Sequence, residues 1–531
     1  MSTKFIFVTG GVTSSLGKGL NASSIGRLLK GRGLKVFMQK FDPYINVDPG
    51  NMSPLQHGEV FVTDDGAETD LDLGHYERFI DENLSQYSSV TTGKIYLRVI
   101  EKERTGKYNG GTVQVIPHIT NEIKEAITNA ATYSGADVVI TEIGGTVGDI
   151  ESLPYLEAIR QYRRDVGYEN TLYIHNTLVP YIAASQELKT KPTQHSVKDL
   201  RSLGINPDVI ILRSDRKIPQ QQKDKISLFC DVPIEAVIEA RDRKTIYEVP
   251  VMLAKQKIDD FICRHFRLET KPLDLSEWKQ MIENIKNLQG TVRIALVGKY
   301  VALKDAYLSV YEALKHGAYA NGVNIKTDPI DAKILTSENV SEVLGGYQGI
   351  IVPGGFGGRD TDGIMLAIRY AREHQIPYLG ICYGMQLAMV EFARNVLSHP
   401  EATSKELDEN GKLLVIGLKD YRKGFGQPMR LGLYPCTIKD GTKLSEIYQT
   451  KQIRERHRHR YEVNNQTLDL FSGSDMIFSG YNEEDQIVEA LELLNHPWFV
   501  ACQFHPEFLS RPNRAHPLFA AFIKAALQNH Q

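Results

Sequence analysis

Short runs of apolar residues alternate along the chain with longer segments in which apolar residues recur every three or four positions. The runs at 4–9, 136–141 and 349–352 have the length of buried strands, whereas 20–29 and 385–394 have the period of helices. Strands that alternate with helices in this way are typical of parallel sheets covered by helices. We therefore expect an α/β protein whose sheets are mainly parallel and flanked by helices.

One stretch interrupts this alternation. Residues 267–290 are charged, contain proline and carry a single helical pattern at 275–288, after which a new apolar strand begins. A chain of 531 residues is also too long for one hydrophobic core. The pattern predicts a first domain at 1–266, a linker at 267–290 and a second domain at 291–531.

The composition narrows the possible classes of protein. The net charge of −3 gives no overall attraction to nucleic acid or to an anionic membrane. Five cysteines without C-x-x-C spacing argue against a disulfide framework or a zinc ribbon. The first apolar run is too short for a signal peptide, and no run reaches the length of a bilayer span. We expect a cytoplasmic protein with neither a membrane nor a nucleic acid as partner.

The basic stretch 454–460 is the one segment whose composition also fits a nucleic-acid patch. Its Glu455 and the apolar strands beside it favour a folded basic loop instead.

Cys382 lies between the apolar run 376–381 and the helical pattern that follows, with Gly380 and Gly384 on either side. A strand, a sharp turn and a helix in this order indicate a nucleophile elbow, here with a thiol. We expect the two glycines to allow the tight backbone. The alternative is a structural cysteine, since free cysteines are often buried.

Two further segments favour the nucleophile. His505 and Glu507 follow the apolar run 499–502, where they can supply a base and the group that orients it. The strand 349–352 runs into Gly354 and Gly355, whose backbone N–H groups can face a developing oxyanion. Cys, His and Glu in this chain order resemble the class I glutamine amidotransferases, in which the trio releases ammonia from glutamine.

Different chemistry is indicated near the N-terminus, where the strand 4–9 enters a glycine-rich loop that ends in Lys18 and a helix. Such a loop holds phosphate through its N–H groups, the helix dipole and the lysine. The strict motif is not met: five residues separate Gly11 from Gly17, and Gly19 replaces the Ser or Thr that normally binds Mg²⁺. Carboxylates elsewhere must therefore hold the metal.

Glu142 and Asp72 are the candidates for that role. Glu142 follows the buried strand 136–141, at the end where ligand sites lie in such sheets. Asp72 lies in the acidic stretch 63–74, for which a solvated loop is the stronger reading when it is taken alone.

A second basic loop at 189–194 combines two lysines, hydroxyls and an amide around a proline. This combination suits a second polyanion such as a triphosphate. A solvated basic loop fits the same residues equally well.

Six motifs, taken in order, resemble the CTP synthase family through nearly the whole chain. They are the segments 4–19, 40–50, 57–62, 142–152, 189–194 and 456–462. The resemblance implies an amidoligase domain of the P-loop type fused to a class I glutamine amidotransferase. It implies ATP, UTP and glutamine as substrates, Mg²⁺ with the ATP, GTP as an allosteric activator, CTP as a feedback inhibitor, and a homotetramer.

Matching positions imply the individual roles. Cys382, His505, Glu507, Lys18 and Lys40 would be catalytic, and Asp72 and Glu142 would hold the metal. ATP would contact Ser15, Leu16, Gly17, Lys18, Gly19, Leu20, Asp72 and Arg243, with Arg241 beside the adenine. UTP or CTP would contact Ser14, Asp149, Ile150, Glu151, Lys189, Thr190, Lys191, Pro192, Thr193, Gln194 and Lys225. Glutamine would contact Gly355, Tyr383, Gly384, Met385, Gln386, Glu406 and Arg460. An ammonia passage would open at Pro54, His57 and Val60.

The chain departs from the family pattern at Tyr383, where a leucine is expected, and in the stretch 358–362. Two other readings remain at this stage. Another ATP-dependent glutamine amidotransferase would have no reason for a second triphosphate site, and a non-catalytic scaffold would have no reason to keep both sets of reactive residues.

Overall fold

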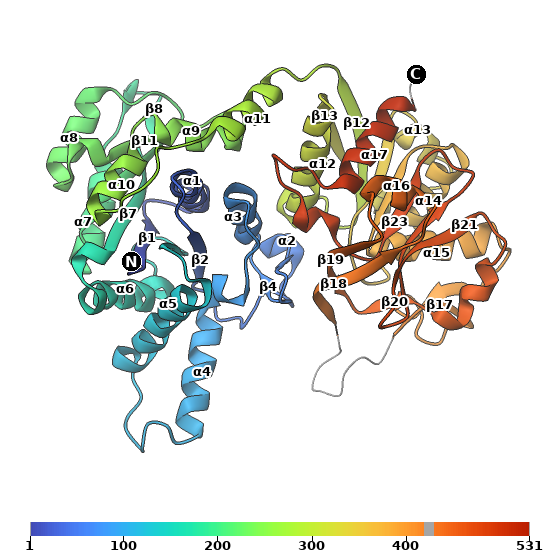
Figure 1. Ribbon diagram of the computed structural model, residues 1–531, viewed down its shortest axis with the longest axis horizontal. Coiled ribbons are helices and arrows are strands. Elements are labelled where there is room, and N and C mark those ends of the chain that lie inside the picture. Colours follow the sequence, from blue (N-terminus) through green and yellow to red (C-terminus); the bar gives the residue numbers. More distant parts are fainter. Residues whose placement is uncertain (1, 419–428, 530–531) are drawn as a thin grey trace. The chain divides into compact units, whose positions relative to one another are not determined.

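The computed structural model describes residues 2–418 and 429–529. The chain forms two compact units, which are described separately below (Figure 1). The first unit comprises Met1–Pro49 and Asp72–Ile282, and the second comprises Gly50–Leu71 and Glu283–Gln531. In the described parts of the chain, no helix has the length and apolar character needed to cross a bilayer.

The division differs from the expected domain boundaries at one segment. Residues 50–71, which the sequence places inside the first domain, pack with the second unit. The reason is direct backbone pairing: Glu59 N–H donates to Asp305 O over 2.9 Å, and Leu433 N–H donates to Asp64 O over 2.9 Å. A purely local reading of the sequence misses this excursion because its partners lie hundreds of residues away.

The first unit is built on a seven-stranded sheet in which every pairing is parallel. In sheet order its strands are β11 (Val237–Arg241), β10 (Val209–Ser214), β7 (Thr171–Leu178), β1 (Lys4–Gly10), β6 (Val138–Ile143), β2 (Val36–Asp42) and β5 (Ser89–Thr91). The central strands β1, β6 and β2 are buried on both faces, which explains their continuous apolar runs. The predicted fold class is confirmed for this unit.

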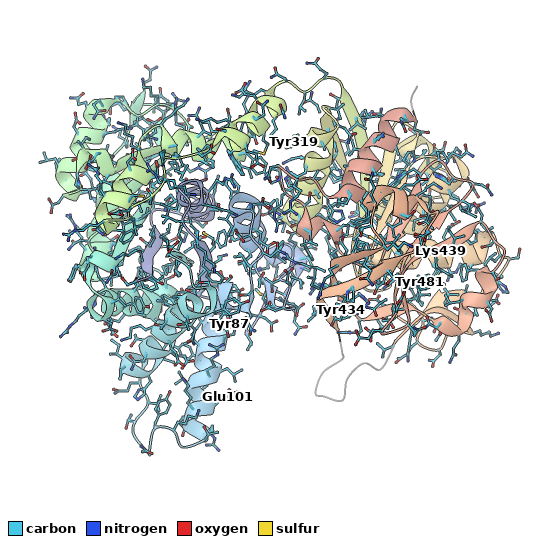
Figure 2. The ribbon with its side chains drawn as sticks, in the orientation of Figure 1. Tyr87, Glu101, Tyr319, Tyr434, Lys439 and Tyr481 are labelled. Atoms are coloured by element: carbon cyan, nitrogen blue, oxygen red, sulfur yellow. The ribbon has the colours of Figure 1, made fainter. Side chains whose placement is uncertain are left out.

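Helices separate these strands in the chain. They are α1 (Lys18–Gly31), α3 (Asp72–Ile80), α4 (Thr92–Arg104), α5 (Thr120–Ser134), α6 (Leu153–Val166), α7 (Lys191–Ser202), α8 (Gln220–Cys230), α9 (Val249–Ala254) and α10 (Ile258–Phe266). Helix α4 projects from the body of the unit, and Glu101 lies on this projecting part (Figures 1 and 2). The predicted linker helix is α11 (Ser276–Lys286), and the division between the units falls within it.

The second unit is built on a nine-stranded mixed sheet. Its parallel part consists of β13 (Asn324–Asp331), β12 (Thr291–Gly298), β14 (Gly349–Val352), β15 (Tyr378–Ile381) and β23 (Phe499–Cys502). Its antiparallel part consists of β22 (Ile487–Leu493), β21 (Met476–Asn482), β18 (Arg430–Ile438) and β19 (Gln452–His459). The expectation of a mainly parallel sheet therefore describes only the part that carries the elbow.

Smaller elements complete the second unit. They are α2 (Pro54–His57), β3 (Phe61–Val62), β4 (Glu68–Thr69), α12 (Leu308–Ala320), α13 (Val340–Leu344), α14 (Thr361–Glu373), α15 (Tyr383–Asn395), β16 (Ala402–Ser404), β17 (Leu413–Leu418), α16 (Lys443–Tyr448), β20 (Tyr461–Val463) and α17 (Pro517–Gln528). Two hydrophobic cores cover the two faces of the sheet, so alternate residues of β12 enter opposite cores. Strand β15 lies between β14 and β23, and its C-terminal end therefore opens at the centre of the parallel part.

Candidate functional site

Cys382 occupies the turn between β15 and α15, as predicted. Its φ and ψ of 51° and −97° lie outside the backbone regions that residues other than glycine favour, which is typical of a nucleophile elbow. The flanking glycines are needed for a different reason from the one expected, since neither has a positive φ. A Cβ on Gly384 would lie 2.3 Å from Val352 O, and one on Gly380 would lie 2.9 Å from Ala501 Cβ. Close packing against the neighbouring strands therefore requires the glycines.

His505 and Glu507 form the expected pair just beyond β23. His505 Nδ1 lies 2.7 Å from Glu507 Oε1, and both side chains are buried. Burial disfavours the imidazolium, but the Glu507 carboxylate and the Cys382 thiol outweigh it and raise the pKa of His505 to about 10. The imidazole is therefore held in its protonated form, beside the thiol.

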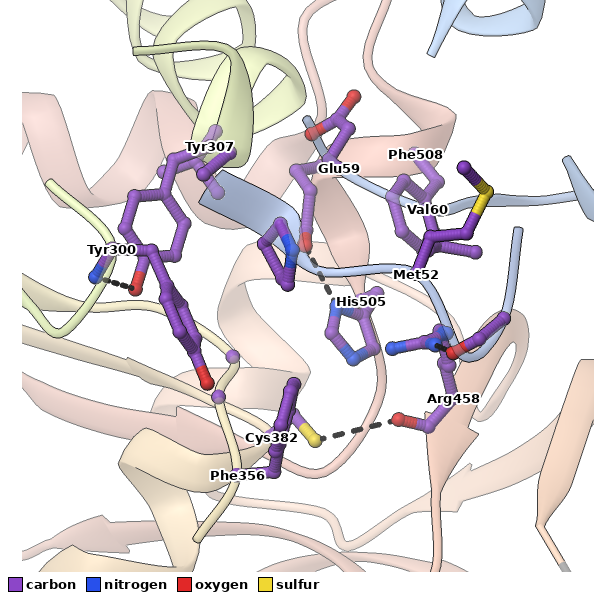
Figure 3. A pocket seen from close by; sticks show the side chains of 17 residues that line it. Met52, Glu59, Val60, Tyr300, Tyr307, Phe356, Cys382, Arg458, His505 and Phe508 are labelled. Atoms are coloured by element: carbon purple, nitrogen blue, oxygen red, sulfur yellow. Dashed lines mark hydrogen bonds and ion pairs between the residues drawn. The ribbon is translucent and has the colours of Figure 1, made fainter. Parts of the chain in front are cut away.

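The thiol has two further neighbours, the first of which is drawn in Figure 3. Its Sγ lies 3.8 Å from the backbone carbonyl of Arg458, and Gln503 Nε2 donates toward it over 3.5 Å. Gln503 was not among the predicted residues. It precedes His505 by two positions at the end of β23, and this spacing is the signal that could have identified it.

The predicted oxyanion loop is held by three side chains. Tyr383 Oη donates to Gly357 O over 2.6 Å, Lys299 Nζ donates to Phe356 O over 3.1 Å, and Gly357 N–H donates to Glu406 over 2.7 Å. Lys299 Nζ also lies 3.1 Å from Tyr383 Oη. The tyrosine next to the nucleophile therefore fixes the loop.

Gly354 in this loop is required by close approach. A Cβ there would lie 2.7 Å from His505 Cε1, so a side chain would displace the base. The glycine-rich sequence thus serves the packing of His505 as well as the exposure of N–H groups.

Two cavities meet at the thiol, both within the second unit. The larger, of about 280 Å³, is lined by Gly50, Asn51, Met52, Gly355, Phe356, Cys382, Gln386, Glu406, Met429, Arg458, His459, Arg460 and Tyr461. It includes four of the residues expected to bind glutamine. The other three, Tyr383, Gly384 and Met385, belong to α15 and do not line it.

The smaller cavity, of about 90 Å³, lies on the side of His505. It is lined by Gly50, Met52, Pro54, Glu59, Val60, Tyr300, Ala306, Tyr307, Val310, Gly354, Gly355, Phe356, Cys382, Arg458, His505, Glu507 and Phe508 (Figure 3). Pro54 and Val60, two of the three residues expected at a passage entrance, are among them, whereas His57 is not.

The phosphate loop of the first unit runs from the end of β1 to the start of α1. Val12, Ser15 and Gly17 have φ values of 80°, 58° and 81°, and left-handed backbone of this kind is common in anion-binding loops. Lys18 Nζ donates to Ile143 O over 2.8 Å and also contacts Gly145 O. Burial lowers the pKa of Lys18.

Two carboxylates converge where a P-loop hydroxyl would stand. A Cβ on Gly19 would lie 2.9 Å from Glu142 Oε2 and 3.3 Å from Asp72 Oδ1, so a larger residue would displace the carboxylates. Lys40 forms ion pairs with Asp72 and, over 3.0 Å, with Asp42. The strand register brings Lys40 opposite Glu142.

The charges in this cluster oppose one another. Burial, and next the nearby Asp72 carboxylate, raise the pKa of Glu142. Burial would also raise the pKa of Asp72, but the Lys40 ammonium outweighs it and lowers that pKa. Within residues 2–418 and 429–529, no group of three or more His, Cys, Asp or Glu side chains could hold a metal ion alone.

The comparisons with known proteins agree with this geometry. The model for the CTP synthase N-terminus matches residues 4–268, and the model for class-I glutamine amidotransferases matches residues 302–525. A CTP synthase of Geobacillus kaustophilus is 60% identical over 99% of this chain and 100% of its own length. A CTP synthase of Halalkalibacterium halodurans is also 60% identical, over the same shares of the two chains.

The chain belongs to the CTP synthase family. Among solved structures, the glutaminase domain of a Trypanosoma brucei CTPS with bound acivicin is 35% identical and has a TM-score of 0.43, covering 45% of this chain and 94% of that one. The chain is thus an enzyme, a glutamine-dependent ligase of the CTP synthase family.

The other nucleotide residues expected from the CTP synthase resemblance are less closely grouped. Lys189 pairs with Glu187, Gln194 Nε2 donates to Thr190 Oγ1 over 3.1 Å, and Lys191 and Pro192 begin α7. Thr193 is fully buried, and its hydroxyl lies 3.0 Å from Thr177 Oγ1. The loop 189–194 is therefore partly buried and is not a freely solvated loop.

The remaining expected contacts lie at the surface of the first unit. Ile150 is 79% exposed, between the exposed Asp149 and Glu151. Lys225 and Arg243 are also exposed, whereas Arg241 pairs with Glu239 over 2.6 Å. One unpredicted residue joins the phosphate loop, since Arg213 donates to Ser15 O over 2.7 Å.

Proposed function

We propose that this chain makes CTP from UTP in two coupled steps: ammonia is released from glutamine in the second unit, and UTP is activated by ATP in the first. The observation that carries the proposal is the presence, in one member of the CTP synthase family, of a buried Cys-His-Glu trio and a separate phosphate loop with converging carboxylates.

The glutamine step follows from the trio. The Cys382 thiolate attacks the side-chain amide carbon of glutamine, and N–H groups of the loop at Gly354 and Gly355 stabilise the oxyanion. The His505 imidazolium then gives its proton to the leaving nitrogen, and ammonia departs. Water, deprotonated by His505, cleaves the thioester to release glutamate and restore the thiolate. Glu507 keeps the imidazole oriented throughout.

In the larger cavity, Glu406 and Arg460 provide one negative and one positive group, which complement the two charged groups of a free amino acid. The Arg460 guanidinium suits the α-carboxylate of glutamine, and the Glu406 carboxylate suits its α-ammonium. Burial raises the pKa of Glu406, and a bound ammonium would favour its charged form.

The UTP step needs a better leaving group at C4 of uracil. Transfer of the γ-phosphoryl of ATP to O4 converts an oxide into a phosphate, which ammonia can displace. Charge spreads over the phosphoryl oxygens during transfer, and Lys18 and Lys40 are the cations available to stabilise it. On binding nucleotide, Lys18 exchanges carbonyl partners for phosphate oxygens.

A magnesium ion fits the same cluster. Asp72 and Glu142 supply two carboxylates, the ligand type that Mg²⁺ prefers, and the remaining ligands would be water and phosphate. The ion neutralises phosphate charge when bound. It would also relieve the repulsion between the two carboxylates that contributes to the raised pKa of Glu142.

Ammonia must reach UTP unprotonated, since ammonium has no lone pair. The smaller cavity begins at the thiol and extends to Pro54 and Val60, and we propose that it is the start of the ammonia passage.

We further propose GTP as activator, CTP as inhibitor near Asp149, Ile150 and Glu151, a homotetramer and a cytoplasmic location. Sedimentation with saturating ATP and UTP should show the tetramer. An active monomer under those conditions would contradict the assembly.

The decisive experiment is the absorbance change on mixing purified protein with UTP, ATP, Mg²⁺ and glutamine. We expect CTP and equal amounts of ADP and glutamate. ATP hydrolysis that does not depend on UTP would favour another ATP-dependent amidotransferase, and no turnover at all would favour a scaffold.

A further inference from the structure

Arg458 links the nucleophile to the excursion of the chain at residues 50–71. Its backbone carbonyl lies 3.8 Å from Cys382 Sγ. Its side chain makes two further bonds. Nε donates to Glu68 Oε1 over 2.9 Å, and Nη2 donates to Gly50 O over 2.9 Å. One residue of β19 therefore touches the thiol and two positions of the segment 50–71, which lines both cavities.

The same segment contributes to the wall that the two cavities share. Six residues line both of them: Gly50, Met52, Gly355, Phe356, Cys382 and Arg458. Beyond this shared wall, the larger cavity continues to Glu406 and Arg460, and the smaller one continues to Pro54 and Val60. Ammonia formed at the thiol therefore has a cavity on either side, and Gly50 and Met52 lie on the wall that both cavities share.

The contacts of Arg458 are placed to hold that position. The Arg458 and Glu68 side chains are only 20% and 15% exposed, so their charge-assisted bonds are shielded from water. Gly50 fits closely against the pair, because a Cβ there would lie 2.2 Å from Glu68 Oε2. Neither the carbonyl contact with the thiol nor the strand β19 depends on what side chain residue 458 carries.

We propose that Arg458 is a positioning residue for ammonia transfer: by binding Glu68 and Gly50 it holds residues 50–52 across the cavity and directs ammonia toward Pro54 and Val60. This inference rests on the proposed function. It adds a residue that controls how much of the ammonia released from glutamine is used to make CTP. Without the Arg458 side chain, the wall loosens and ammonia escapes through the glutamine side.

The test compares glutamate with CTP formed from glutamine in the full-length protein. In Arg458→Met we expect glutamate per CTP to rise by about threefold or more, because charged hydrogen bonds are lost from a partly buried pair. The matched control is Arg454→Met, at an exposed position on the same strand, where the ratio should not change. Synthesis from added ammonium measures the intact first unit and should stay close to wild type.

Gly50→Ala tests the same contacts, those of Arg458 with Glu68 and Gly50, without changing the arginine. Its Cβ must push the Glu68 carboxylate aside, and its φ is compatible with alanine, so the same rise in the ratio is expected. If Arg458→Met lacks ammonia-dependent synthesis, Gly50→Ala decides the question. An unchanged ratio in Gly50→Ala, or in an active Arg458→Met, overturns the inference. A wild-type protein that makes no CTP from glutamine would instead overturn the proposed function.

Discussion

The two reactive sites of this chain are organised in opposite ways. In the second unit, the thiol, the histidine and the glutamate lie at strand ends, and His505 is already bonded to Glu507 and matched electrostatically to Cys382. In the first unit, Lys18 is bonded to backbone carbonyls and Lys40 to carboxylates, while Glu142 and Asp72 repel each other. The groups of one site are paired with one another, whereas those of the other include two carboxylates whose charges repel.

The difference follows from the chemistry. A covalent step needs a nucleophile, a base and an oxyanion pocket at fixed positions, all of which side chains and backbone can supply. Phosphoryl transfer needs little covalent help and much charge, and part of that charge arrives with the nucleotide and its metal. Substitutions should therefore separate the two sites cleanly.

The largest separation is expected from Cys382→Ala. Glutamine-dependent CTP formation should fall by at least about a thousandfold, because no other residue replaces the thiol. Synthesis from ammonium at alkaline pH, where free ammonia is abundant, should persist. Both rates are measured from the change in absorbance as UTP is converted to CTP. Retained glutamine-dependent synthesis would place the nucleophile elsewhere, and loss of both activities in a folded protein would end the two-site description.

Glu142→Ala and Lys18→Ala should give the reverse pattern. Each removes charge that serves phosphoryl transfer, so CTP formation from either nitrogen source should fall by more than about a hundredfold. Glutamate release from glutamine should continue at some level in both variants. Normal CTP formation by Glu142→Ala would remove the carboxylate from the metal site.

Glu507→Gln sharpens the description of the preformed site. Because Glu507 is the strongest influence favouring the imidazolium, its loss should lower the titration midpoint of His505 by about two pH units, or about a hundredfold in proton affinity. NMR titration of the histidine measures this. The proton on His505 stabilises the folded state fully below its ordinary value of 6.5, and this contribution is lost as the pH rises through about 10. A midpoint unchanged by the substitution would contradict the pairing.

Tyr383→Phe should have the smallest effect, about a tenfold fall in glutaminase kcat with KM changed less, because the hydroxyl loses its contacts with Gly357 O and Lys299 while Lys299 still holds the loop at Phe356 O. Ammonia-dependent synthesis should not change. Tyr370→Phe on α14 removes a tyrosine hydroxyl outside the loop and serves as the control. A fall in glutaminase kcat/KM that comes from a higher KM, with kcat unchanged, would indicate that Tyr383 contacts the substrate instead of positioning the loop.

Local patterns in the sequence were sufficient to predict much of the fold and of the candidate site. The elbow at Cys382, the pair His505 and Glu507, and the phosphate loop each lie in one continuous stretch where a strand ends, and continuous stretches have readable signatures. The parallel sheet of the first unit was predictable for the same reason, since strands buried on both faces give unbroken apolar runs.

The rest depends on contacts between distant residues. Arg458 and Glu68 are 390 positions apart, and neither stands out in its own neighbourhood. Lys299 looks like a residue at a strand end until the fold brings it 3.1 Å from Tyr383 Oη. The antiparallel half of the second sheet was missed because strands of either orientation can show similar apolar patterns.

The excursion of residues 50–71 bears on how such an enzyme can be taken apart or recombined. A gene cut at the linker would deliver a glutaminase cassette that lacks part of its own unit. Arg456, whose side chain is fully buried, would lose Asp64, its partner over 2.7 Å, and the reaction chamber would lose one wall. Exchange of glutaminase modules between relatives should therefore succeed only when both pieces of the unit come from the same parent.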